Sequence, residues 1–221
     1  MTASVGVVVF PGSCDEHDAA RAIRRTPGLE PRYLWHADAD LAGVDAVIVP
    51  GGFSYGDYLR AGAIARFAAA GGPVLGICNG FQVLCEAGLL PGALLPNTSL
   101  RFICRQVDVL VEHPRCSFTA ECEPGESLSL PVKHGFGRWY APAEQLGELE
   151  RKGQLVLRYA PGQNPNGSSR DVAGVMNEAG NVLGLMPHPE HAVDELNGSA
   201  DAGRLFGSLA ASLGAASPVA A

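Results

Sequence analysis

The stretch Pro73-Val74-Leu75-Gly76-Ile77-Cys78-Asn79-Gly80-Phe81-Gln82-Val83-Leu84 decides the fold of this chain. Its first half is apolar and follows Gly71-Gly72, which is typical of a buried strand. From Asn79 onward apolar residues recur at helical spacing, so a helix is predicted to follow the strand with hardly any turn between them. Cys78 therefore lies at a sharp corner between a strand and a helix.

Glycines stand two positions before and two positions after Cys78, at Gly76 and Gly80. Their missing Cβ atoms let the strand, the corner and the helix approach one another, which is the pattern of a nucleophile elbow. The positive end of a helix also favours a thiolate over a thiol at this position. The alternative interpretation is a small buried side chain, which most free cysteines are. The choice depends on whether the chain supplies a base.

The rest of the chain alternates between strands and helices before it becomes rich in strands. Strands are predicted over 5–10, 32–36 and 45–49, and helices over 15–25 and 61–70. A capping box of Ser13 and Glu16 is expected to start the first helix. Later strands are predicted over 102–112, 127–132 and 154–159, followed by a hairpin of 172–176 and 182–186 and a last helix near Ser199.

This order predicts an α/β fold of one domain over residues 1–221. Its central, mostly parallel sheet has helices on both faces and a small antiparallel section, and the tail frays from about residue 214. Ligands of such sheets gather at the carboxyl ends of the strands. Four loops are expected there: Pro11-Gly12-Ser13, Gly51-Gly52-Phe53, Cys78-Asn79, and the segment from Pro187 onward.

Composition excludes several classes of function. The net charge of −7 argues against a nucleic-acid or anionic-membrane surface. No apolar run approaches the roughly 18 residues of a membrane span, and the N-terminus lacks the basic region of a signal peptide, so we expect a cytoplasmic protein. The six cysteines show no metal-binding spacing, which predicts free thiols and no metal site. Neither of the two common glycine-rich phosphate-binding motifs is present.

A base for Cys78 is supplied by the stretch Met186-Pro187-His188-Pro189-Glu190. The two prolines predict an extended conformation, in which His188 and Glu190 share a face. The carboxylate could then orient one imidazole nitrogen while the other faces Cys78. A loop histidine beside a solvated glutamate is the alternative, but an elbow cysteine at the same edge of the sheet favours a catalytic triad.

The order Cys78, His188, Glu190, with Gly-Ile-Cys-Asn-Gly-Phe-Gln at the elbow and His-Pro-Glu at the base, resembles the class I glutamine amidotransferases. The resemblance narrows to the glutaminase subunits of phosphoribosylformylglycinamidine synthases and covers almost the whole chain. It implies a flavodoxin-like fold. The stretches that carry it are Val9-Phe10-Pro11-Gly12-Ser13, Gly51-Gly52-Phe53-Ser54-Tyr55-Gly56-Asp57, Asn97-Thr98-Ser99-Leu100-Arg101-Phe102 and Asn164-Pro165-Asn166-Gly167-Ser168.

The resemblance implies a glutaminase that hydrolyses L-glutamine through a cysteine thioester. The ammonia would pass to a large synthetase subunit that converts formylglycinamide ribonucleotide to formylglycinamidine ribonucleotide in purine biosynthesis. A small bridging subunit would complete the complex. No cofactor is implied for this chain, because ATP and magnesium would be held by the synthetase.

The resemblance also implies the roles of individual residues. Cys78 would be the nucleophile, His188 the general acid and base, and Glu190 the residue that orients His188. Backbone N–H groups would hold the oxyanion. The residues implied are Gly52, Phe53 and Asn79 for the oxyanion hole, and Gln82 and Gly51 for substrate binding.

The chain departs from this family at three places and leaves two alternatives open. It has Cys14-Asp15-Glu16 where Asn-Cys-Asp is usual, Phe136 where a glutamate is familiar, and His191 where an arginine is common. One alternative is another cysteine hydrolase of α/β type, which would need its acid before its histidine along the chain, whereas Glu190 follows His188. The other is a non-catalytic regulatory subunit, which would most simply lack one member of the triad.

Overall fold

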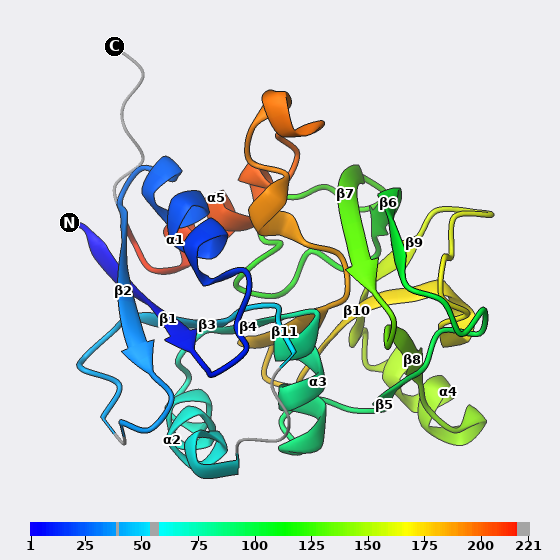
Figure 1. The fold of residues 1–221 in the computed structure, drawn as a ribbon, viewed down its shortest axis with the longest axis horizontal. Coiled ribbons are helices and arrows are strands. Elements are labelled where there is room, and N and C mark those ends of the chain that lie inside the picture. The colour runs from blue at the N-terminus through cyan, green and yellow to red at the C-terminus, as the bar shows by residue number, and fades with distance from the viewer. Residues whose placement is uncertain (39, 54–57, 216–221) are drawn as a thin grey trace.

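The computed structural model describes residues 1–38, 40–53 and 58–215. Within these residues one large sheet crosses the molecule, and a two-stranded sheet of β5 (Ala93–Leu95) and β8 (Arg138–Tyr140) lies beside it (Figure 1). The order in the large sheet is β2 (Leu29–Trp35), β1 (Ala3–Val9), β3 (Ala46–Val49), β4 (Val74–Ile77), β11 (Val182–Leu185), β10 (Val172–Met176), β9 (Leu155–Tyr159), β6 (Ile103–Val111) and β7 (Ser127–His134).

The two halves of this sheet differ in strand direction. From β2 to β11 neighbouring strands run parallel, and from β11 to β7 they run antiparallel. The predicted hairpin of β10 and β11 joins the halves, with Gly174 opposite Leu185. The predicted α/β fold with a central parallel sheet and an antiparallel section is confirmed.

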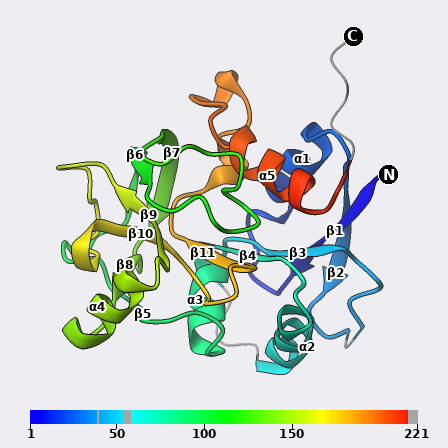
Figure 2. The same cartoon turned by 180° about the vertical axis from the view of Figure 1, so that it is seen from behind.

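Helices cover both faces of the sheet. Helices α1 (Glu16–Arg25) and α5 (Gly203–Ser212) lie on one face, and α2 (Tyr58–Ala69) and α3 (Asn79–Glu86) lie on the other, as Figures 1 and 2 show. Each strand contributes side chains to the packing on both faces of the sheet, because side chains alternate in direction along a strand. In β3, Ile48 packs with the α1 side and Val47 with the α2 side. A strand buried on both faces needs the continuous apolar run that these segments have.

Some elements differ from the sequence-based expectation. The short strands β5 and β8 and the helix α4 (Ala143–Arg151) were not expected. Helix α4 could have been found from its amphipathic spacing, since Leu146 and Leu149 are its buried residues and Pro142 stands at its N-cap. The last helix begins at Gly203, after short 3-10 turns at Ser169–Asp171 (η1), Pro189–His191 (η2) and Glu195–Asn197 (η3).

The predicted capping box at the start of α1 is wrong. The N-cap is Asp15, whose side chain makes no capping hydrogen bond. The hydroxyl of Ser13 instead accepts a hydrogen bond from the backbone N–H of Phe10 at 2.8 Å. Ser13 is therefore used to close the turn after β1, which competes with capping.

Two predictions fall outside the described residues. These are the Ser54–Asp57 part of the glycine-rich motif, and the frayed tail at 216–221. All six cysteines are described, and all are free thiols. In the described ranges no helix is both long and apolar enough to cross a membrane.

Candidate active site

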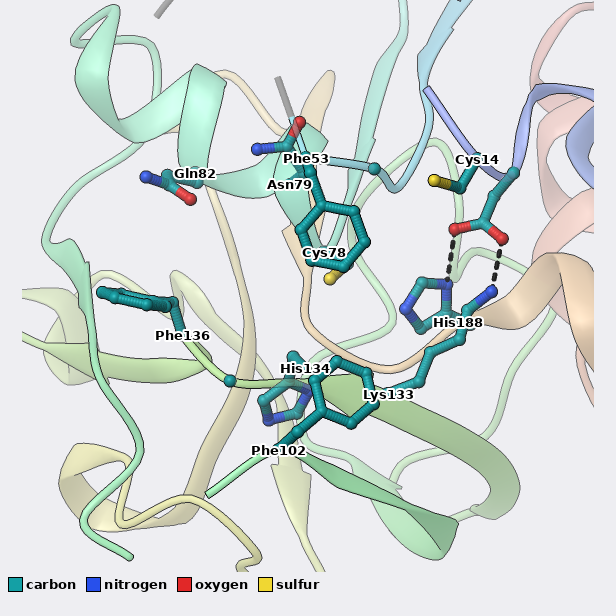
Figure 3. Close-up of a pocket in the computed structure, with 13 residues that line it drawn as sticks. Cys14, Phe53, Cys78, Asn79, Gln82, Phe102, Lys133, His134, Phe136 and His188 are labelled. Atoms are coloured by element: carbon teal, nitrogen blue, oxygen red, sulfur yellow. Dashed lines mark hydrogen bonds and ion pairs between the residues drawn. The ribbon is translucent and has the colours of Figure 1, made fainter. Parts of the chain in front are cut away.

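The four loops expected at the carboxyl ends of the parallel strands do meet. They follow β1, β3, β4 and β11, and together with β7 they line a pocket of about 420 Å³ (Figure 3). The pocket is lined by Cys14 and Asp15, which directly follow the predicted Pro11-Gly12-Ser13 loop, and by residues of the other three loops, namely Gly52 and Phe53, Cys78 and Asn79, and His188. The pocket is thus built from segments far apart in the sequence, as the topology predicts.

Cys78 has the backbone of a nucleophile elbow. Its φ of 52° and ψ of −103° lie in a region that L residues rarely adopt, and it forms the N-cap of α3. The corner is fixed by its N–H, which donates to the carbonyl of Leu185 at 2.9 Å. A Cβ at Gly76 would lie 2.8 Å from the carbonyl oxygen of Gly80, and a Cβ at Gly80 would overlap the carbonyl of Val49. Both predicted glycine requirements are confirmed.

His188 follows β11 and is anchored to the antiparallel half of the sheet. Its backbone N–H donates to the carbonyl of Pro131 in β7 at 2.8 Å. His188 itself is extended, with φ −104° and ψ 90°, but Pro189 begins the 3-10 turn η2. The predicted extended conformation is therefore wrong at Glu190, because the fixed φ of proline also suits the first position of a helical turn.

The turn brings the carboxylate of Glu190 back onto the imidazole. Glu190 Oε1 lies 2.6 Å from His188 Nδ1, and both side chains are buried. Burial alone lowers the pKa of His188, but the charges of Glu190 and Cys78 outweigh it and raise the pKa to about 10. His188 is therefore an imidazolium at neutral pH, oriented through Nδ1.

The other ring nitrogen of His188, Nε2, is the one that Cys78 can approach. Among the described residues Nε2 has no partner within hydrogen-bond geometry, although Cys78 is near enough for its charge and hydrogen bonding to raise the pKa of His188. Hydrogen bonds between catalytic groups are often unformed in free enzymes and tighten only when substrate binds. In Figure 3 the nitrogen of His188 that has no dashed line is on the side of the ring toward the sulfur of Cys78. This arrangement suits a thiolate–imidazolium pair.

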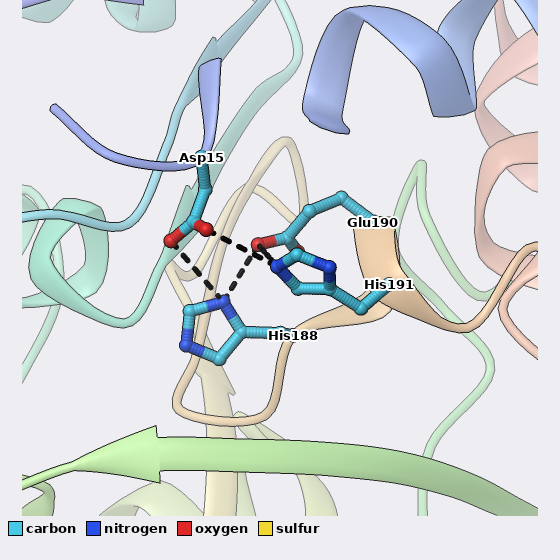
Figure 4. A group of neighbouring side chains, drawn as sticks. All are labelled: Asp15, His188, Glu190 and His191. Carbon is cyan, nitrogen blue, oxygen red and sulfur yellow. Dashed lines mark hydrogen bonds and ion pairs between the residues drawn. The ribbon is translucent and has the colours of Figure 1, made fainter. Parts of the chain in front are cut away.

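A second carboxylate, Asp15, reaches His188 from the loop after β1 (Figure 4). Its Oδ2 lies 3.7 Å from His188 Nδ1, its Oδ1 lies 3.1 Å from His191 Nε2, and Lys133 forms an ion pair with it. Burial raises the pKa of Asp15, but these three partners together bring it well below its usual range. The sequence reasoning missed Asp15 and Lys133. The sequence does contain a signal for Asp15, because an acidic residue directly follows a loop at the edge of the sheet where ligands gather.

Asp15, His188, Glu190 and His191 each offer one ligand atom, and these atoms lie within 4.8 Å of one another. A metal ion placed there would have to displace the ammonium of Lys133 from Asp15 and the proton of His188 from Glu190. The carboxylates of this cluster are already paired with cationic side chains, so the cluster fits a metal ion poorly.

The segments expected to form the oxyanion hole lie next to Cys78. Asn79 is the first residue of α3, and Gly52 and Phe53 line the pocket with it. A Cβ at Gly52 would lie 2.9 Å from Ser13 Cα, so the loop after β1 requires this glycine. The N–H of Phe53 donates to the carbonyl of Gly12 at 2.9 Å. Phe53 could serve an oxyanion only by giving up that bond.

The two residues expected to bind substrate lie at different places. Gln82 lines the pocket and donates to Glu86 Oε1 at 2.9 Å in an exposed pair. Gly51 is buried, and a Cβ there would lie 2.8 Å from His188 Cε1 and closer still to Asp15 Oδ2. Gly51 thus leaves room for the side chains around His188.

The wall opposite Cys78 is formed by β7 and the loop after it. His134 is buried there, and burial together with the charge of His188 lowers its pKa to about 4, so it is neutral. Asn166 Nδ2 lies 3.1 Å from its Nε2, and Asn97 donates to its carbonyl at 2.8 Å. The Asn97 and Asn166 motifs therefore shape the pocket wall. Phe136 is 61% exposed at the pocket mouth.

Comparison with known proteins places this chain in a family. Residues 2–204 match the model of the CobB/CobQ-like glutamine amidotransferase domain. The chain is 60% identical over 207 residues to the phosphoribosylformylglycinamidine synthase subunit PurQ of Rubrobacter xylanophilus, covering 89% of this chain and 93% of that protein. It is 57% identical over 218 residues to PurQ of Frankia casuarinae, covering 94% and 93%. A solved structure of PurLQS from Thermotoga maritima matches with a TM-score of 0.86 and 44% identity, over 96% of this chain and all of that one.

Proposed function

The chain belongs to the CobB/CobQ-like glutamine amidotransferase family, and we propose that Cys78, His188 and Glu190 are its catalytic residues. It is a glutaminase subunit of phosphoribosylformylglycinamidine synthase, an enzyme of purine biosynthesis. The proposal for the residues is supported by one geometric observation. A buried imidazole held by a carboxylate at 2.6 Å shares a pocket with a cysteine on a strained elbow.

The first half of the reaction forms a thioester. The thiolate of Cys78 attacks the side-chain amide carbon of glutamine, which forms the C–S bond and an oxyanion. As the carbonyl re-forms, the C–N bond breaks and the His188 imidazolium gives its proton to the departing nitrogen, which leaves as ammonia. The raised pKa of His188 keeps that proton available at neutral pH.

The second half releases glutamate. Neutral His188 takes a proton from a water molecule, whose oxygen attacks the thioester carbon. The C–S bond then breaks, glutamate leaves, and the thiolate–imidazolium pair is restored. Glu190 accepts the hydrogen bond from Nδ1 throughout and keeps the ring oriented, as the third residue does in other triads.

Backbone groups of Gly52, Phe53 and Asn79 remain our proposal for the oxyanion hole, with Gln82 and Gly51 as substrate-binding residues. Their support is their position around the elbow. A donor of this kind contributes about 3 to 4 kcal/mol to transition-state stabilisation. Because the Phe53 N–H already donates to Gly12, it would have to turn toward the substrate to act as such a donor.

We further propose that this chain acts as one cytoplasmic domain in a complex with the large synthetase and small bridging subunits. The synthetase would hold ATP and magnesium, and this chain would need no cofactor. Ammonia must leave the pocket without escaping to solvent, which requires a partner at the mouth. The exposed rings of Phe53, Phe102 and Phe136, at 70%, 58% and 61% exposure, are suited to such an apolar contact.

The test is Cys78→Ala in the assembled synthase. Glutamine-dependent synthesis should vanish while synthesis from added ammonia continues, because only the supply of nitrogen is lost. Cys104→Ala is the matched control, since Cys104 is exposed and outside the pocket. Residual glutamine-dependent activity in Cys78→Ala would contradict the assignment and would favour a different hydrolase site. Full activity would favour the non-catalytic regulatory subunit.

A further inference from the structure

Asp15 does not do what its position in the sequence suggests. It occupies the N-cap of α1, where aspartate usually accepts a hydrogen bond from the first turn of the helix. Its carboxylate makes no such bond and instead turns into the site, away from the helix that it begins. The usual stabilisation of a capped helix is given up for contacts elsewhere.

Those contacts come from three other segments of the chain. His188, just before η2, lies 3.7 Å from Asp15, His191 on η2 lies 3.1 Å from it, and Lys133 approaches from β7. Asp15 is 3% exposed, so a carboxylate with no partners would be costly here. The ion pair with Lys133 and the bond to His191 keep it charged and in place.

The backbone opposite also accommodates this carboxylate. Gly51 lies two residues past the end of β3, and any larger residue there would collide with both Asp15 Oδ2 and His188 Cε1. Asp15 and His188 are therefore packed against one another over a position that has no side chain.

We propose that Asp15 is a positioning residue that, with Glu190, holds the His188 imidazolium from its Nδ1 side, and that Lys133 and His191 fix Asp15 for this role. The inference rests on the proposed function of His188. Glu190 makes the hydrogen bond to Nδ1, and Asp15 supplies a second negative charge on the same side of the ring. Because both carboxylates occupy the Nδ1 side of the ring, Nε2 is the nitrogen left to face Cys78.

The charged and titratable groups around His188 come from every element packed against it. Glu190 and His191 lie on η2, Lys133 and His134 on β7, Cys78 on the elbow, and Asp15 before α1. His134 is neutral, so it carries no charge that would offset the loss of Asp15. Removing the Asp15 carboxylate therefore leaves the site more positive. An imidazolium in a more positive site loses its proton at lower pH.

The test is the pH dependence of kcat/KM for glutamine in the assembled synthase carrying Asp15→Asn. We expect the alkaline limb, which reports loss of the His188 proton, to move down by about one pH unit, a tenfold change in the proton equilibrium. We also expect kcat at the optimum to fall about tenfold or more, because the imidazole loses one of the two carboxylates that hold it in place. The concentration of active sites is measured by alkylation of Cys78, followed on its peptide.

Two further variants separate charge from structure. Asp45→Asn makes the same change just before β3, at the end of that strand opposite to the pocket, where the exposed carboxylate accepts a hydrogen bond from the N–H of Ser4 at 2.8 Å, and it should leave the profile unchanged. Asp15→Asn/Lys133→Met removes the anion and its cation together. Its alkaline limb should return toward the wild-type position while kcat stays low, because the charge is balanced again but the support is missing.

The proposal is overturned if the profile of Asp15→Asn superimposes on that of the wild type after correction for active sites. A uniform loss at every pH would likewise overturn it, since this is what a purely structural role predicts. Failure of the proposed function is seen separately, because it would leave glutamine-dependent activity in Cys78→Ala whatever Asp15→Asn does.

Discussion

Glu190→Gln is the sharpest test of how the imidazole is controlled. Glu190 is fully buried, and its carboxylate lies 2.6 Å from His188 Nδ1. The substitution keeps the shape of the side chain and removes its charge. The effect should therefore be electrostatic, and its size can be worked out from the hydrogen bond.

A hydrogen bond to a charged group contributes about 1.5 to 3 kcal/mol, and one pKa unit corresponds to about 1.4 kcal/mol. Glu190→Gln should thus lower the pKa of His188 from about 10 by about one to two units. The shift should exceed that of Asp15→Asn, because Asp15 lies farther from Nδ1, at 3.7 Å. The rate should fall about a hundredfold to ten-thousandfold, the range that a correctly held general acid and base contributes.

The assay is kcat/KM for glutamine against pH in the assembled synthase, measured as glutamate release. The matched control is Glu178→Gln, an exposed glutamate paired with Lys152 on the surface, which should leave the profile unchanged. An alkaline limb that stays in place in folded Glu190→Gln would refute the reasoning. So would an equal loss of activity in the control.

Four further outcomes are expected. Gly80→Ala should destabilise the protein by about 1 to 3 kcal/mol in urea unfolding, because its Cβ would overlap the Val49 carbonyl. Gly147→Ala, in a helix with open space around it, should stabilise by up to about 1 kcal/mol, and destabilisation there would contradict the packing argument. The lowered pKa of Asp15 gives stability that is present above its unfolded pKa of about 4 and lost as pH falls below it, and Asp15→Asn should flatten this acid limb of the unfolding free energy. Gln82→Ala should raise KM for glutamine with little change in kcat, and an unchanged KM would remove Gln82 from the binding site.

Much of the site could be predicted because its signals are local. The two glycines around Cys78 predict the elbow, and continuous apolar runs predict the strands of the parallel half. The meeting of four loops follows from the parallel topology alone. The resemblance to glutaminases was carried by short motifs of this kind, and the family comparison agrees with it.

Other features were missed because the sequence offers two local solutions and tertiary contacts choose between them. Pro189 suits both an extended segment and a helical turn, and the hydrogen bond from Ala192 to its carbonyl at 3.0 Å belongs to the turn. Ser13 and Asp15 are both good capping residues for α1, yet neither side chain makes a capping hydrogen bond, because Ser13 closes the turn after β1 and Asp15 pairs with Lys133 and His191.

The sequence by itself determined the elbow, the alternation of strands and helices, and the edge of the sheet where ligands gather. These depend on residues within a few positions of one another and on rules of chain connection. Only the tertiary structure decided the charge network around His188. Asp15, Lys133 and His191 are more than a hundred positions from at least one of their partners, and which polar groups share a buried site depends on packing that no local pattern records.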